Sequence, residues 1–176
     1  MAEKKLINEQ YDVQEADASK GFAKGERRSD YADPWKETGN IVLMGLDGCG
    51  KGELASLLAE RTRQEAATPK SPEEAVESLS GKGRIVVLRD DLVDHADVRP
   101  LIHGSGKAFY LQADTNTLSA RVAERDGVDD KEALWRESSA RLAQLEPVFY
   151  ETLHFILHAF NGPEAMVEDA LEKIAL

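Results

Sequence analysis

An apolar run that ends in a glycine-rich turn constrains the fold of this chain more than any other feature. Residues 41–45 read IVLMG, and glycine recurs at positions 48, 50 and 52. An uninterrupted apolar run of this length, rich in β-branched residues, is typical of a strand buried on both faces. Residues 52–63 then place leucines at helical spacing, at positions 54, 57 and 58, with charged residues opposite. The predicted local order is strand, glycine loop, amphipathic helix.

The glycine loop has the spacing of a phosphate-binding loop. Residues 45–52 read GLDGCGKG and fit the pattern G-x-x-x-x-G-K. In that pattern, backbone amides turn toward phosphate oxygens, the following helix adds its N-terminal dipole, and the lysine, here Lys51, supplies charge for the β and γ phosphates. The alternative is a glycine-rich turn that binds no ligand. The residues predicted to bind the nucleotide cofactor, ATP or ADP, are Gly45, Asp47, Gly48, Cys49, Gly50, Lys51, Gly52 and Glu53.

Three residues of this segment leave alternatives open. Gly52 stands where Ser or Thr usually supplies a hydroxyl ligand to Mg²⁺, so the sequence allows Mg²⁺ as a cofactor but predicts weakened binding. Glu53 either brings negative charge close to the phosphates or points outward and stabilises the helix N-terminus. Cys49 is either a reactive thiol near a helix N-terminus or a small filler residue.

Predicted strands and helices alternate along the rest of the chain. The runs at 84–88 (RIVVL) and 107–111 (KAFYL) predict buried strands, and 152–157 predicts a last strand or a helix-to-strand transition. Helices are predicted at 94–103, 115–125, 130–144 and 163–174, with one short helix in the polar segment 65–83. This alternation implies an α/β fold of the three-layer P-loop NTPase type, with a parallel sheet of about four strands and helices on both faces.

The length and composition of the chain limit the number of domains, the cellular compartment and the classes of partner that it can have. The 176 residues fit one ordinary domain, predicted at 40–176, which follows a polar N-terminal extension at 1–39. The single cysteine excludes a disulfide or a multi-cysteine zinc site within the chain and favours a reducing, cytoplasmic setting. No apolar segment predicts a signal peptide or a membrane span. The formal charge of −11 argues against nucleic acid as a partner.

Charged residues after the second strand and on the helix at 115–125 complete the predicted site. Asp90 and Asp91 follow a buried strand, as a Walker B acid does, so either would hold Mg²⁺ through water or act as a general base, with Asp90 the candidate metal ligand. The alternative is a solvated strand end. Arg121 and Arg125 would either approach the phosphates or form a solvated helix face. The predicted catalytic residues are Lys51, Asp90, Asp91 and Arg125.

Three stretches of the chain resemble the shikimate kinase family, a branch of the P-loop small-molecule kinases with a nucleoside-monophosphate-kinase-like fold. They are NIVLMGLDGCGKGELASLLAERT at 40–62, GKAFYLQADTNTLSARV at 106–122 and EPVFYETLHFILHAFNGPEAMVEDALEKI at 146–174. The first is shared by P-loop kinases in general, and the other two are typical of this family. The resemblance implies ATP-dependent phosphoryl transfer to a hydroxyl of a small-molecule acceptor.

The chain departs from this family where the acceptor would bind. It lacks the family's Asp-x-Asp element, and the segment before 84–88 has room for a short helix only, which predicts that the second strand and most of the acceptor subdomain are deleted. The family's Gly-Gly-Gly falls on residues 89–91 (RDD), and an arginine of the last motif falls on Glu146. The arginine-proline lid pattern is absent between Arg121 and Trp135.

Three functions are compatible with this pattern. The first is a divergent kinase that binds a nucleoside triphosphate, with incomplete catalytic machinery and an acceptor other than shikimate. The second is a non-catalytic nucleotide-binding or scaffold protein whose extension binds a protein partner. The third is an authentic shikimate kinase whose acceptor site is built from unfamiliar residues.

Overall fold

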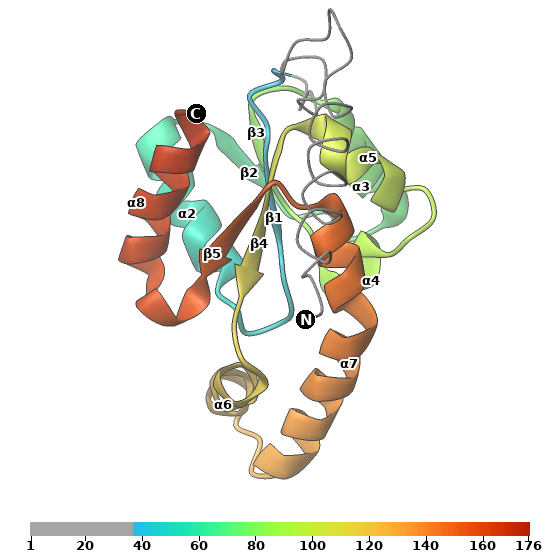
Figure 1. Ribbon diagram of the computed structural model, residues 1–176, viewed down its shortest axis with the longest axis vertical. Coiled ribbons are helices and arrows are strands. Elements are labelled where there is room, and N and C mark those ends of the chain that lie inside the picture. Colours follow the sequence, from blue (N-terminus) through green and yellow to red (C-terminus); the bar gives the residue numbers. More distant parts are fainter. Residues whose placement is uncertain (1–36) are drawn as a thin grey trace, which may run out of the picture. The chain divides into compact units, whose positions relative to one another are not determined.

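One parallel sheet forms the centre of the domain (Figure 1). The structure is a computed structural model that describes residues 37–176, so positions 1–36 of the predicted extension lie outside the described residues. Within 37–176 the sheet has five strands in the order β2-β3-β1-β4-β5. The strands are β1 (Ile41–Met44), β2 (Glu65–Ala67), β3 (Arg84–Val87), β4 (Lys107–Gln112) and β5 (Phe155–His158). The predicted α/β class with a parallel sheet is confirmed, and the sheet has one strand more than predicted.

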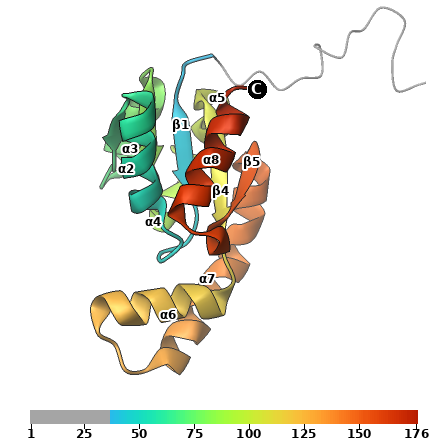
Figure 2. The ribbon, with the colours of Figure 1, turned by 90° about the vertical axis from the view of Figure 1, so that its left-hand side faces the viewer.

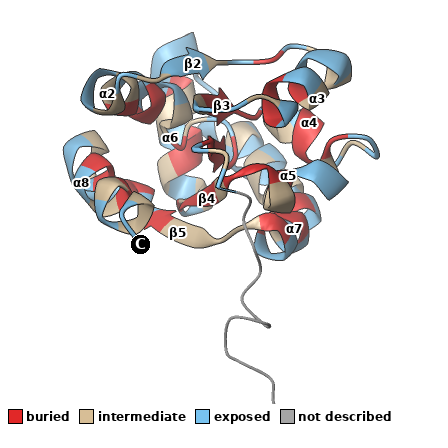
Figure 3. Ribbon diagram, turned by 90° about the horizontal axis from the view of Figure 1, so that it is seen from above, coloured by how far each residue is buried: buried red, intermediate tan, exposed pale blue. Residues whose placement is uncertain are grey.

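Helices cover both faces of this sheet (Figures 2 and 3). The helices α2 (Lys51–Thr62) and α8 (Pro163–Ile174) pack on one face. The other face is covered by α3 (Pro72–Ser80), α4 (Asp90–Val93), α5 (Arg99–Ser105) and α7 (Lys131–Thr152). The helix α6 (Thr115–Asp126) follows the carboxyl end of β4 and packs against α7, and the 3-10 turn η2 (Ala159–Asn161) links β5 to α8. No helix within residues 37–176 is long and apolar enough to cross a membrane.

The central strand β1 is buried along its whole length. It pairs in parallel with β3 and β4, so that Val42 lies beside Val86 on one side and Ala108 on the other. Side chains of β1 point alternately to the two faces of the sheet, and both faces are covered by helices. An apolar run without polar interruption is therefore what this position requires, as the sequence predicted.

A buried asparagine joins the starts of two strands to the ends of two helices. The side chain of Asn40, which is 2 % exposed, donates to the carbonyl oxygens of Gly81 (2.7 Å) and Ser105 (3.1 Å). Its side-chain oxygen accepts a hydrogen bond from the Arg84 amide at 3.0 Å. All the polar atoms of one side chain are thus used to join the starts of β1 and β3 to the ends of α3 and α5.

Local sequence determines the hairpin formed by α6 and α7. The Asp114 carboxylate accepts a hydrogen bond from the Thr117 amide (2.9 Å) at the start of α6, and Asp130 accepts one from the Ala133 amide (3.0 Å) at the start of α7. Gly127 ends α6 with a φ of 66°, a conformation that glycine adopts without strain. These caps fix where α6 begins and ends and where α7 begins.

Three predicted segments need correction. The predicted deletion of the second strand is wrong, because residues 65–67 form β2; its sequence EAA has low strand propensity, and pairing with β3 stabilises it. The helix predicted at 94–103 begins later, because residues 94–98 form a turn between the short helix α4, which precedes the predicted range, and α5. The helix predicted to end at residue 144 continues through Pro147 to Thr152, because Val148 and Phe149 are buried and their packing outweighs the hydrogen bond that proline removes.

Candidate functional site

The predicted phosphate loop connects β1 to α2 at the carboxyl edge of the sheet. Its glycines Gly45, Gly48 and Gly50 have φ values of 148°, 86° and 90°. A Cβ atom on Gly48 would lie 2.9 Å from the carbonyl oxygen of Leu118, so that position requires glycine for space as well as for conformation. Because α2 begins at Lys51 and Gly50 carries no capping side chain, the first amides of α2 are open toward the loop.

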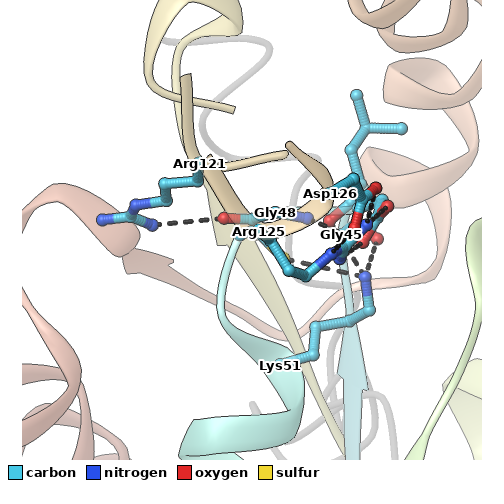
Figure 4. A network of polar contacts seen from close by, with 9 residues as sticks. Gly45, Gly48, Lys51, Arg121, Arg125 and Asp126 are labelled. Carbon is cyan, nitrogen blue, oxygen red and sulfur yellow. Dashed lines mark hydrogen bonds and ion pairs between the residues drawn. The ribbon is translucent and has the colours of Figure 1, made fainter. Parts of the chain in front are cut away.

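The side chain of Lys51 reaches back from α2 into this loop (Figure 4). Its Nζ donates hydrogen bonds to the carbonyl oxygens of Gly45 and Leu46, the second at 3.0 Å, and lies 3.7 Å from the Sγ of Cys49. The ammonium group is half-buried. Its charge is therefore held within the loop, which is where this motif places it for phosphate binding.

The side chain of Cys49, a residue of the phosphate loop, is buried. Cys49 is 1 % exposed, and its Sγ would be 2.8 Å from a Cβ atom on Gly45. This tight packing agrees with the interpretation of Cys49 as a small filler residue. Glu53, by contrast, is exposed in the first turn of α2, a position where a carboxylate stabilises the helix dipole.

One arginine connects α6 to the loop. Arg125 donates two hydrogen bonds to the Asp47 carboxylate, at 2.7 and 2.8 Å, and also binds Asp126 at 2.7 Å. The Gly48 amide donates to the same Asp47 carboxylate at 3.0 Å. Hydrogen bonds from Arg125 hold the pKa of Asp47 below its ordinary value of 3.8, and hydrogen bonds to Asp126 and Asp47 raise the pKa of Arg125. Asp47 is therefore charged at neutral pH and holds Arg125 at the loop.

A second arginine of α6, Arg121, also contacts the phosphate loop. The guanidinium of Arg121 donates to the carbonyl oxygen of Gly48 at 3.3 Å (Figure 4). It also donates to the carbonyl oxygen of Ala159, in η2, at 3.0 Å. Arg121 is partly buried. The positions of the loop, α6 and the segment after β5 are therefore coupled through one side chain.

The two acids that follow β3 have different surroundings. Asp90 is partly buried and faces Arg141 of α7, whose Nε lies 3.5 Å from the Asp90 carboxylate and whose Nη2 donates to the Asp90 carbonyl oxygen at 3.2 Å. Asp91 is exposed and binds Arg89 at 2.9 and 3.0 Å. Within residues 37–176, no group of three or more His, Cys, Asp or Glu side chains is arranged to hold a metal ion.

A cavity of about 880 Å³ brings most of these groups together. Its volume lies in the range of pockets that bind small molecules, about 300–1,000 Å³. Of the predicted site residues, Gly45, Cys49 and Asp91 do not line it. The predicted residues that do are Asp47, Gly48, Gly50, Lys51, Gly52, Glu53, Asp90 and Arg125.

Several lining residues were absent from the predicted site. They are Thr68 and Arg89 just after β2 and β3, Glu137 of α7 and Met166 of α8, whereas Arg121 of α6, which also lines the cavity, was predicted either to approach the phosphates or to form a solvated helix face. The signal for Thr68 and Arg89 is their position after parallel strands, whose carboxyl ends form the usual binding edge of such sheets. Glu137 and Met166 carry no comparable signal, because only the packing of α7 and α8 brings them to this edge.

Comparison with known sequences gives two curated relatives, and no family model matches the chain. The chain is 29 % identical to Shikimate kinase 2 of Yersinia enterocolitica over 107 residues, which are 57 % of this chain and 61 % of that protein. It is 27 % identical to Shikimate kinase 2 of Syntrophotalea carbinolica over 106 residues, which are 57 % of this chain and 62 % of that one. The chain thus spans less than two thirds of the length of these relatives.

Solved structures show the same architecture. The shikimate kinase of Bacteroides thetaiotaomicron superposes with a TM-score of 0.68 at 15 % identity, covering 78 % of this chain and 98 % of that one. The YorR protein of Bacillus subtilis, in complex with phosphorylated GDP, gives 0.64 at 17 % identity and covers 78 % and 96 %. The fold and the loop are therefore those of the P-loop kinases. Within that class the chain is similar in sequence and in fold to shikimate kinases, in agreement with the resemblance seen in the sequence.

Proposed function

We propose that this chain binds ATP and transfers its γ-phosphoryl group to a hydroxyl of a small-molecule acceptor other than shikimate. The observation that carries the proposal is the position of the Lys51 ammonium, held inside a glycine loop at the wall of a cavity that also contains Asp90 and Arg125. Charge for the phosphates and a carboxylate for the acceptor are thus available in one place. The names of the two curated relatives support a kinase.

Each group has a distinct role in this reaction. Lys51 and the loop amides hold the phosphates, and Arg125, released from Asp47, neutralises charge on the moving group. The acceptor oxygen forms a bond to the γ phosphorus while the bond to the oxygen shared with the β phosphate breaks. Asp90 accepts the proton of the acceptor hydroxyl. Catalysis would then rest on positioning and electrostatics, because the protein forms no covalent intermediate.

Mg²⁺, which phosphoryl transfer of this type uses, fits the site as an ion that arrives with the nucleotide. Gly52 offers no hydroxyl ligand, and the described residues hold no cluster of three ligands. Phosphate oxygens and water would therefore supply the ligands, and Asp90 would reach the ion only through one of these waters, which leaves its carboxylate able to accept a proton. Bound there, Mg²⁺ would neutralise charge on the phosphates.

The residue at position 146 argues against shikimate as the acceptor. The family resemblance places a carboxylate-binding arginine there, and this chain has Glu146. Glu146 lines neither cavity of the described residues and supplies no positive charge that could pair with the carboxylate of shikimate. We therefore expect the acceptor to differ from that of the relatives whose names include shikimate.

Nucleotide binding without transfer is the second candidate. It is favoured by the Asp90 carboxylate, which faces the Arg141 guanidinium 3.5 Å away, and by the missing hydroxyl at Gly52. A nucleotide-binding protein needs Lys51 and the loop but not a free Asp90. Both candidates therefore predict nucleotide binding, but only the kinase predicts phosphoryl transfer.

Calorimetric titration of ATP and ADP, with and without Mg²⁺, tests the shared part of both candidates. We expect micromolar binding by the wild type and at least a roughly thirtyfold weaker Kd for Lys51→Ala, since one lost charged contact costs about 2 kcal/mol. Lys82→Ala removes an exposed positive charge outside the cavity and is the matched control. A folded wild type that binds neither nucleotide would refute the proposal.

Turnover then separates the remaining possibilities. ADP release is followed in a coupled assay with a panel of hydroxyl compounds that includes shikimate. Release that depends on an acceptor other than shikimate and disappears in Lys51→Ala supports the kinase. Release with shikimate identifies an authentic shikimate kinase, and nucleotide binding without release under any acceptor supports the non-catalytic candidate.

A further inference from the structure

A second cavity adjoins the first on the side of the α6–α7 hairpin. Its volume is about 350 Å³, and it shares Asp47, Asp90 and Glu137 with the larger cavity. Asp47 belongs to the phosphate loop and Asp90 follows β3, so a molecule in this cavity would lie beside the end of a nucleotide held by Lys51. The volume is near the lower end of the range for small-molecule pockets. It is therefore the place that an acceptor would occupy in the proposed reaction.

Negative groups dominate the polar wall of this second cavity. The wall contains the carboxylates of Asp47, Asp90, Asp126 and Glu137 and one guanidinium, that of Arg141. Arg141 faces Asp90, and Arg125 of the neighbouring wall is bound by both Asp47 and Asp126.

Glu137 is the carboxylate without compensation. It makes no ion pair with any residue in the range 37–176 and lines both cavities. An incoming carboxylate would thus meet no uncommitted positive charge here, whereas an incoming ammonium group would meet a free carboxylate. The negative charge of Glu137 therefore favours a cationic ligand, and the position of the cavity beside the phosphate loop indicates where that ligand would bind.

We propose that the second cavity is the acceptor subsite and that it selects a small polyhydroxylated ring bearing an ammonium group, such as an amino sugar or aminocyclitol. This inference rests on the proposed function. Glu137 would bind the ammonium group, Ser138 would hydrogen-bond a ring hydroxyl, and Leu46, Val122 and Leu134 would pack against ring carbons.

The group transfer is the one already described, with this acceptor. A ring hydroxyl oxygen forms the bond to the γ phosphorus of ATP, the bond to the β,γ-bridging oxygen breaks, and ADP leaves. The hydroxyl proton passes to Asp90. The ammonium group stays protonated throughout and serves only to position the ring.

Direct binding of three rings of similar size tests the charge preference. The aminocyclitol 2-deoxystreptamine, neutral myo-inositol and the carboxylate quinate are titrated calorimetrically into the full chain, alone and with ADP. We expect 2-deoxystreptamine to bind at least about tenfold more tightly than myo-inositol, with quinate weakest, from the sign of the local charge. Quinate binding as tightly as the aminocyclitol would overturn the inference.

Charge variants at position 137 show whether this preference arises in the cavity. Glu137→Gln should reduce the preference for the aminocyclitol about tenfold, and Glu137→Lys should reverse it toward quinate. Glu124→Gln makes the same charge change on an exposed residue of α6 outside both cavities and should leave it unchanged. Circular dichroism confirms that each variant is folded. If the preference for the aminocyclitol is the same in both Glu137 variants as in the wild type, the second cavity is not the acceptor subsite.

The binding data distinguish a failure of this inference from a failure of the proposed function. A selective aminocyclitol complex without ADP release in the presence of ATP would refute phosphoryl transfer while supporting the ligand class of the cavity. ADP release with neutral or anionic acceptors only, together with ATP binding that requires Lys51, would support the kinase and overturn the inference.

Discussion

Replacing Asp47 by asparagine is expected to tighten nucleotide binding. In the structure, Arg125 is held by two hydrogen bonds to Asp47, at 2.7 and 2.8 Å, and is therefore not free to meet a phosphate. Asparagine has nearly the same size and keeps an oxygen that accepts the hydrogen bond of the Gly48 amide. The substitution removes the negative charge from the loop and leaves Asp126 as the only carboxylate that binds Arg125, so the guanidinium can turn toward a phosphate more easily.

The size of the effect follows from the exposure of the pair. The side chains of Arg125 and Asp47 are 53 % and 60 % exposed. Exposed ion pairs contribute about 0.2–1 kcal/mol, and bidentate geometry places this one at the upper end. Removing a charge that repels the phosphates adds a gain of similar size at low salt. Together these give about 1–2 kcal/mol, or a roughly five- to thirtyfold lower Kd for ADP.

Calorimetry of ADP binding at low and high salt measures this gain. The gain should shrink at high salt, because partly exposed charges are screened. Asp129→Asn makes the same charge change at an exposed position outside the cavities and should shift the Kd far less. Combining Asp47→Asn with Arg125→Ala should remove the part of the gain that depends on the freed guanidinium. An unchanged or higher Kd for Asp47→Asn at low salt would refute the reasoning.

Three further predictions concern the framework of the site. Asn40→Ala should lower the free energy of unfolding by about 2–4 kcal/mol in urea titrations, because buried backbone groups lose their partners, whereas exposed Asn161→Ala should change it little. Gly48→Ala should abolish calorimetric ADP binding and lower the free energy of unfolding by about 1–3 kcal/mol, through a left-handed φ and a contact at 2.9 Å. Asp114→Ala should cost about 1 kcal/mol at neutral pH. Hydrogen bonds from Thr117 lower the pKa of Asp114, so this difference is present above the ordinary value of 3.8 and is lost as the pH falls through the lower folded pKa, which acid titration of both variants would show.

The centre of the sheet could be predicted because its information is local. The runs at 41–44, 85–88 and 108–111 are apolar throughout, and a strand covered by helices on both faces requires that pattern. The edge strand β2 carries no such pattern. Its residues are largely exposed, and it is held by backbone pairing with β3, for example Ala66 beside Ile85. Long-range pairing of this kind leaves little trace in a three-residue sequence.

The same distinction applies to the candidate site. Lys51 and the loop glycines are contiguous, so one motif placed them. Glu137 and Arg141 lie far along the chain and reach the loop only because α7 packs against α6 and against α4, the short helix that follows β3. Their spacing of four residues puts both on one face of a helix, which is a usable signal once that helix is known to cover the carboxyl edge of the sheet.

The charges that replace the family's glycines after β3 do not close the cavity, because they pair with one another. Arg89 binds Asp91 at 2.9 Å and keeps it away from the loop, while Asp90 remains on the cavity wall beside Arg141. Together with Arg125 and Asp47, three guanidinium groups at this edge are each matched by a carboxylate of the same chain, and each of these pairs is partly exposed.

Partly exposed pairs of this kind contribute about 0–1 kcal/mol each, so a polyphosphate can replace a carboxylate partner at small cost. Ligand binding would therefore exchange partners at these arginines instead of adding new charge to the site. Each of these arginines would give up a carboxylate when it binds a phosphate, so one screened ion pair replaces another. The affinity for nucleotide should therefore fall less steeply with salt than the number of nearby arginines suggests. A steep dependence would mean that the arginines meet the phosphates without leaving their carboxylates.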